Sequence, residues 1–544
     1  MKVKVYSKKQ LKKGLILRRV LIAGTLALTI GTTAIVGPRV AKNDKKDRAY
    51  SNAKTEITYV SASDYIREDD DYVEVTNRST PISMNEEKLN SFREYVDSIE
   101  TDYPITDLIE IETALARESS FKSSTSTHPD LRSTSGKIQL DTLVNTVVKN
   151  SDAYYENLGS MKSFYTKMTR SEISAISEII IDTIEKESEI NNIDIKTISH
   201  KLSALKMFKK SGSVAIASMN SENVFTVNDN MLNVASIIAN EQNAFVDTVI
   251  HETEHIIQGD IPENVDAYHI GPCFRDKSLD INPLYWSWYI EASAEKSMMN
   301  LTGDENITYA SQINYLESIA YALTLNDDYN VGDLEKITLT KDREKLMNLL
   351  GLDRDEFISL MYAVEIIQTE SKEFDSTYEN KTGSPLDNDT LVELKRKLKG
   401  AFTESLAKVF YKNLASQICT GKLDLESSFY LIKIFEADAF SHIRYDEKEK
   451  LEMALPYLVN YAKIQNAFWQ SLESLELTND EIAKRFDEYS TRVIIDGSKM
   501  ENCNLTQLEK DKTVYIEKRK DSVYSKTVES IVNTVNRHIE KNYN

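Results

Sequence analysis

The sequence predicts a mainly helical protein with a small β element. Glycine and proline are scarce, at 16 and 9 of 544 residues, which favours long helices over tight turns. Apolar residues recur at intervals of three and four through most of the chain, as in amphipathic helices. Two short runs, 213–218 and 223–227, instead have the apolar and β-branched composition of strands. A hydrophobic content of 41% and a charged content of 28% suit a folded body of several structural units.

The amino terminus has the pattern of a membrane anchor. Eight Lys and Arg residues precede an uncharged apolar run of about eighteen residues, 20–37. Such a run lies near the lower limit for crossing the hydrocarbon core, and its basic flank favours a cytoplasmic amino terminus. We therefore expect residues 1–41 to form a basic cytoplasmic segment and a single transmembrane helix, with the body outside the cell. A cleaved signal peptide is the alternative, and the protein would then be secreted.

The rest of the chain divides by composition. Residues 42–83 are polar and are expected to form a linker, followed by a helical region at 84–210. Within that region we predict helices at 84–99, 105–117, 171–189 and 196–209. Residues 211–305 contain the two β-like runs and the motifs described below, and from residue 230 we expect helix almost unbroken to residue 544. The region 306–544 is expected to be helical, with amphipathic stretches at 309–325, 355–369, 391–418 and 451–475.

Charge excludes one class of partner. The chain carries a net charge of −20 although its first nineteen residues are strongly basic, so the remaining body is acidic. An acidic body repels phosphate backbones, and we therefore expect no nucleic-acid partner. The three cysteines are too few and too scattered for a disulfide framework or a thiolate metal site.

The segment His251-Glu252-Thr253-Glu254-His255 has the pattern H-E-x-x-H. On a helix the two histidines lie one turn apart on the same face, where both can bind one zinc ion, and the glutamate between them can act on a water molecule. On a helical wheel of residues 245–258 the histidines lie opposite an apolar stripe formed by Val246, Val249, Ile250, Ile256 and Ile257.

Catalytic zinc needs a third protein ligand. Gln258 and Ile261 occupy the positions where the extended metzincin motif has glycine and histidine, so that form is excluded. Asn282 and Pro283 are a plausible cap and first-turn pair for a following helix, which would carry Glu291 and Glu295 one turn apart. Small residues at 292–294 would allow this helix to approach the first one closely.

With these two motifs, residues 214–300 resemble the gluzincin branch of the zincin metallopeptidases. The resemblance implies an α+β catalytic core flanked by helical regions, a Zn²⁺ cofactor, and a peptide or protein substrate bound along a sheet edge. It implies His251, His255 and Glu291 as metal ligands, Glu252 as general base, and Glu295 as the acid that orients a ligand histidine. The donor that stabilises the oxyanion is left open among four residues near the motifs, His269, Tyr268, Tyr285 and Tyr289.

Two alternatives remain at this stage. Glu254 places a charge between the histidines and the interval from His255 to Glu291 is long, which leaves open a catalytically inert zincin-like protein used for surface contacts or assembly. Separately, residues 118–121 (E-S-S-F) and 136–139 (G-K-I-Q) resemble signatures of lytic transglycosylases. That resemblance implies Glu118 as a general acid acting on peptidoglycan.

Overall fold

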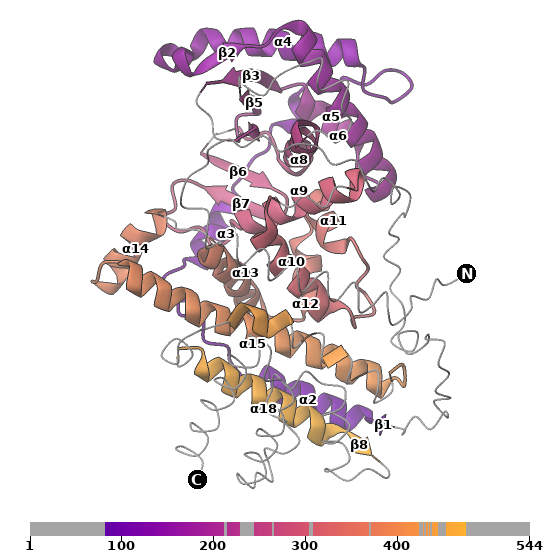
Figure 1. The fold of residues 1–544 in the computed structure, drawn as a ribbon, viewed down its shortest axis with the longest axis vertical. Coiled ribbons are helices and arrows are strands. Elements are labelled where there is room, and N and C mark those ends of the chain that lie inside the picture. The colour runs from indigo at the N-terminus through magenta and orange to yellow at the C-terminus, as the bar shows by residue number, and fades with distance from the viewer. Residues whose placement is uncertain are drawn as a thin grey trace, which may run out of the picture.

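The computed structural model describes residues 82–474, except 212–214, 229–243, 264–265, 304–307, 369–371, 424–427, 429–430, 433–434, 436–437 and 444–452. The prediction of a mainly helical protein with a small β element is confirmed. The elements are arranged along one long axis, with the helix α4 (Leu140–Asn157) at one end and the helices α2 (Glu86–Asp97) and α18 (Leu455–Ser471) at the other (Figure 1).

One end of the molecule combines helices with the largest sheet. Its helices are α4, α5 (Arg170–Asn191), α6 (Ile195–Leu202) and α8 (Ala244–Gln258). The sheet has the order β2-β3-β5-β4, with strands Tyr165–Lys167, Lys206–Lys210, Val224–Asn228 and Ala217–Met219. β3 and β5 are parallel, and β4 pairs antiparallel to β5 at the edge, with Met219 opposite Phe225. The second predicted β-like run therefore lies largely in β5, and residues 217–218 of the first lie in β4, with which β5 forms a hairpin.

The other end is built from helices. Besides α2 and α18 it contains α9 (Ser287–Thr302), α10 (Ala310–Leu323), α11 (Asp333–Thr340), α12 (Arg343–Leu350), α13 (Arg354–Gln368), α14 (Lys372–Thr382) and α15 (Asn388–Cys419). The short helix α3 (Ile111–Ser119) lies near the middle of the molecule (Figure 1). The short strands β1 (Ile82–Ser83) and β8 (Glu473–Ser474) pair with each other beside α2 and α18.

Three local predictions were wrong. The helix expected at 196–209 ends at Leu202, and β3 follows, because its backbone pairs with β5 across the sheet. The helix expected at 105–117 begins only at Ile111. The chain after residue 230 is also not almost unbroken helix. An antiparallel hairpin of β6 (Ala267–Ile270) and β7 (Cys273–Asp276) occupies the long interval between the histidines and Glu291.

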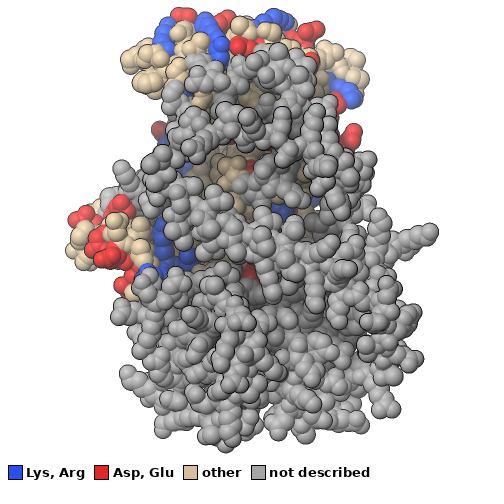
Figure 2. All heavy atoms as spheres, viewed as in Figure 1, with Lys and Arg blue, Asp and Glu red and all other residues tan. Residues whose placement is uncertain are grey.

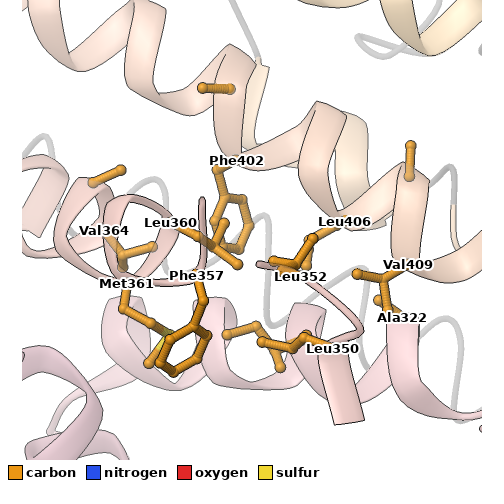
Figure 3. Packing of buried hydrophobic residues seen from close by; sticks show 14 of the residues in the cluster. Ala322, Leu350, Leu352, Phe357, Leu360, Met361, Val364, Phe402, Leu406 and Val409 are labelled. Atoms are coloured by element: carbon orange, nitrogen blue, oxygen red, sulfur yellow. The ribbon is translucent and has the colours of Figure 1, made fainter. Parts of the chain in front are cut away.

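The apolar side chains form two separate cores. One unites α4, α5 and α6 with the sheet and includes Val249, Ile256 and Ile257 of α8. The other fills the helical end and includes Trp288 and Tyr289 of α9. Figure 3 shows part of this second core, where Phe402 and Leu406 of α15 face the side chains of α13. The two helices that carry the sequence motifs thus belong to different cores and meet at their boundary.

Gly400 allows α15 and α18 to pack closely. A Cβ atom at this position would lie 2.9 Å from Cγ and 3.2 Å from Cβ of Tyr457. Overpacking a core position lowers the free energy of unfolding by about 1–3 kcal/mol. Replacing a helical glycine by a residue with a better helix propensity raises it by less than that on average. We expect Gly400→Val to lower the free energy of unfolding by about 2 kcal/mol in urea denaturation. In a Tyr457→Ala background the same substitution should lower the free energy of unfolding by clearly less. An equal decrease in both backgrounds would contradict the contact between the two residues.

A buried carboxyl on α15 makes this end sensitive to pH. Glu404 accepts hydrogen bonds from Thr101 (2.9 Å) and Asn460 (3.2 Å). Burial raises its pKa to about 7, although Lys408 and these hydrogen bonds oppose the shift. Above the ordinary pKa of a glutamate the unfolded chain releases this proton while the folded chain keeps it. The stability of the wild type should therefore fall from about pH 4.5 to pH 7, by roughly 3 kcal/mol relative to Glu404→Gln. Parallel stability profiles of the two proteins would refute this.

The described surface carries charges of both signs. Figure 2 shows basic and acidic side chains side by side around α4, where Lys162 pairs with Glu156 (3.1 Å) and Lys167 with Asp152 (2.8 Å). Among the described residues, no helix combines the length and apolar character needed to cross a lipid bilayer. The predicted anchor at 20–37 lies outside the described residues, as do residues 42–81 of the linker predicted at 42–83.

Candidate metal centre

The side chains of His251, His255 and Glu291 converge where α8 meets α9. The Nε2 atom of His251 lies 3.1 Å from Oε2 of Glu291, and Nε2 of His255 lies 3.4 Å from the same oxygen. One ligand atom from each of the three residues lies within 4.8 Å of the other two. Ligand atoms about 2.0–2.2 Å from a tetrahedral zinc ion are separated by about 3.3–3.5 Å. The donor types therefore suit a zinc ion, and both histidine–glutamate distances match its ligand spacing.

The opposite nitrogen of each imidazole, Nδ1, faces a side-chain oxygen. Nδ1 of His251 lies 3.0 Å from Oε2 of Glu295, at ion-pair distance but off the straight N–H···O line. Oε1 of Glu295 is held by the backbone N–H of Thr308 at 2.6 Å. Nδ1 of His255 lies 3.1 Å from Oε1 of Gln258. Acceptors on Nδ1 favour the tautomer that presents the Nε2 lone pair, which is how ligand histidines are oriented in metal sites.

The electrostatics of the three groups are complementary. Burial favours neutral imidazole in His251, but its interactions with the carboxylates of Glu291 and Glu295 outweigh burial and raise the pKa of His251 to about 10. Burial also opposes the charged form of His255, and the carboxylate of Glu291 again raises the pKa. Burial alone would raise the pKa of Glu291, yet the charges of the two histidines hold it well below its usual range. Glu291 is thus kept as a carboxylate by the two histidine side chains on either side of it.

Glu252 connects the histidine helix to the sheet edge. Its side chain is buried, and burial raises its pKa, while the nearby histidines lower it. The backbone N–H of Met219 donates a hydrogen bond to its carboxylate. Met219 ends β4, the edge strand. A carboxyl in this position has the raised proton affinity that suits a general base.

Tyr309 is a member of the site that the sequence did not reveal. Its ring stacks on the imidazole of His251, with centroids 5.2 Å apart and planes inclined by 9°. Its hydroxyl donates a hydrogen bond to Glu291. Tyr309 caps α10, eighteen residues beyond Glu291, and its role depends on how α10 packs against α9. A tyrosine at this distance along the chain carries no local signal of such a role.

The four residues considered as oxyanion donors lie in other surroundings. His269 is 3.6 Å from Glu118 and packs against Phe121 and Phe274. The Tyr289 hydroxyl donates to the backbone oxygen of Leu334. The remaining two candidates face each other, with ring centroids 6.4 Å apart, and are Tyr268 and Tyr285. The four candidates thus contact Glu118, aromatic rings or backbone away from the two motif helices' converging side chains.

Glu118 forms an ion pair with Arg343. Both terminal nitrogens of Arg343 donate to its carboxylate, at 3.1 and 2.6 Å. A bidentate arginine stabilises the ionised carboxylate, whereas a general acid must hold a proton near neutral pH. The arrangement therefore gives no support to a transglycosylase-like role.

Glu254, the unusual charge in the motif, is not one of the three converging side chains. It is fully buried, and neither carboxylate oxygen has a hydrogen-bond partner among the described residues. Burial, with a smaller contribution from the buried Glu187 of α5, raises its pKa well above the ordinary value.

Removing this carboxyl should stabilise the protein. Burying a polar group without a partner costs about 1–3 kcal/mol in proteins, so Glu254→Met should raise the free energy of unfolding at pH 7 by a similar amount. The unfolded chain ionises above the ordinary pKa of glutamate while the folded chain keeps the proton, so the gain should increase with pH. Urea denaturation at pH 5 and pH 7 measures both effects, and a variant no more stable than the wild type at pH 7 would contradict them.

No known family model, curated protein or solved structure matches the chain. Its function is therefore inferred from the side chains described above.

Proposed function

We propose that this chain is a zinc-dependent metallopeptidase of the gluzincin kind. The observation that carries the proposal is the convergence of three ligand atoms, from His251, His255 and Glu291, at zinc-ligand spacing. The acceptors behind both imidazoles and the buried Glu252 beside them support it further. An isolated pair of histidines on a helix would account for none of these additional contacts.

Each residue of the site can take a separate role in peptide hydrolysis. Zinc at this position would supply Lewis acidity, which acidifies a water molecule and polarises a carbonyl group. Glu252 takes the proton of the attacking water and passes it to the leaving nitrogen as the C–N bond breaks. The products are then a carboxylate and an amine. Tyr309 stacks on His251 and its hydroxyl interacts with Glu291, and we assign it to stabilise the oxyanion in place of the four earlier candidates.

The proposed site of action is outside the cell, and the proposed substrates are peptides or proteins. This placement depends on the basic segment and the apolar run at 20–37, which have the pattern of a single-pass anchor with a cytoplasmic amino terminus. Protease accessibility of the body on intact cells would test the orientation, and a released body lacking residues 1–41 would indicate a cleaved signal instead.

Metal content and peptide hydrolysis, measured on the same preparation, test the function. Purified protein should contain about one zinc per chain, lose activity on a peptide library with a chelator, and recover it when zinc is added. Bound zinc without hydrolysis of any library peptide would leave the inert zincin-like alternative. Protein that neither retains nor binds zinc would refute the proposal.

A further inference from the structure

The helix that carries Glu291 lacks a cap of its own. α9 begins at Ser287, and its N-cap residue, Trp286, provides no side-chain hydrogen bond to the first turn. The first backbone N–H groups of a helix have no partner within the helix, and leaving them unpaired in a buried position is costly. Glu291 lies only one turn beyond this end, so the position of the first turn determines the position of the ligand.

A carboxylate from α13 supplies the missing cap. Oε2 of Glu365 accepts the backbone N–H of Trp288 at 3.1 Å, and Oε1 accepts the hydroxyl of Ser287 at 2.6 Å. Glu365 is buried; burial raises its pKa, and these hydrogen bonds lower it. A negative charge at this place also interacts favourably with the positive end of the α9 dipole.

Two further residues on the same face of α13 hold the start of α9. Phe357, Met361 and Glu365 are spaced one helical turn apart. Phe357 packs edge-on against Trp286, with centroids 5.4 Å apart, and the backbone oxygen of Met361 accepts Nε1–H of Trp288 at 2.9 Å. The first turn of α9 is therefore fixed by residues about seventy positions later in the chain.

We propose that Glu365 is a positioning residue of the metal centre, which acts through the first turn of α9 to hold Glu291 at binding distance from the two histidines. This inference depends on the proposed metal site but not on the proposed reaction. It gives the helical region after residue 306 a role in the site, as the part that fixes the third ligand.

Zinc affinity and the d–d spectrum of the cobalt-substituted protein test this role. Glu365→Ala should weaken zinc binding about tenfold, the lower end for residues that support ligands indirectly, and should shift the cobalt bands. Glu365→Gln keeps an acceptor for Ser287 and should lose only part of that affinity. Because the Gln variant preserves the shape of the side chain, it remains informative if the Ala variant does not fold.

Two controls separate positioning from the loss of another buried carboxyl and from a general loss of stability. Glu404→Gln removes a buried carboxyl of the same helical end whose hydrogen bonds go to Thr101 and Asn460. Gly400→Val destabilises the same end through Tyr457. Both should keep the zinc affinity within twofold of the wild type. Folded Glu365 variants with the wild-type affinity and cobalt spectrum would overturn the inference.

The outcomes also distinguish this inference from the proposed reaction. Wild-type protein that binds zinc but cleaves no peptide would contradict the reaction, while weaker binding in the Glu365 variants would still support the positioning role. Wild-type protein without zinc affinity would overturn both.

Discussion

Glu252→Gln is expected to abolish peptide hydrolysis while zinc stays bound. The amide has nearly the shape of the carboxylate but cannot take a proton from water. General-base catalysis contributes about 10²–10⁴ in rate, so kcat should fall at least a hundredfold. Glu252 is not among the three converging ligands, and zinc affinity should change little. Steady-state kinetics and zinc stoichiometry on the same preparation measure both quantities.

Glu254→Gln is the matched control for this variant. It makes the same chemical change two residues away on the same helix, at a fully buried position that faces Glu187 and lies outside the ligand set. It should retain most of the wild-type kcat. Glu252→Gln protein with more than a tenth of the wild-type kcat would remove Glu252 from the role of base and weaken the case for this reaction.

The sequence predicted the parts of the site that depend on helical spacing. The separation of His251 and His255, and of Glu291 and Glu295, follows from the helical repeat, and in each pair the structure turns both side chains toward the centre. Tyr309 could not be predicted in this way, because its position depends on how α10 folds back against α9. Contacts between distant elements leave no periodic signal in the chain.

The start of α9 shows why a local signal can mislead. Asn282 and Pro283 were expected to begin this helix, but the helix begins at Ser287. The Asn282 side chain instead accepts the backbone N–H of Leu284 at 2.9 Å, within a turn. The cap that the helix uses comes from Glu365, far along the chain. Similarly, residues 206–210 form a strand only because β5 lies alongside them.

The apolar stripe of α8 was predicted correctly, but the sequence made no prediction for the burial of the opposite face. Val249, Ile256 and Ile257 are buried in the first core, as expected. The two histidines are also at least nine-tenths buried, because α9 of the second core covers their side of the helix. A helical wheel shows which residues share a face, but not whether a second element packs on it. The candidate metal centre thus lies between two cores, with histidines on a helix of one and a carboxylate on a helix of the other.

Loss of the carboxylate from the second core should therefore have a large effect on metal binding. In Glu291→Ala protein only the two histidines remain, and a site of two histidines does not hold catalytic zinc. We expect the zinc affinity of Glu291→Ala to fall by more than a hundredfold. Glu295→Ala removes a partner of His251 but no ligand, and its zinc affinity should fall by about 10–100-fold. Chelator competition measures both affinities.

Thermal unfolding provides an independent measure of the same loss. Zinc at about a hundred times its dissociation constant stabilises a folded protein by about 2.7 kcal/mol, so it should raise the Tm of the wild type and of Lys296→Ala. Lys296 is a suitable control because it lies on α9 and pairs with Glu317 at 3.2 Å, outside the ligand set. The Tm of Glu291→Ala should not respond to the same zinc concentration. A zinc-dependent rise in the Tm of Glu291→Ala equal to that of the wild type would mean that the third ligand is a different residue.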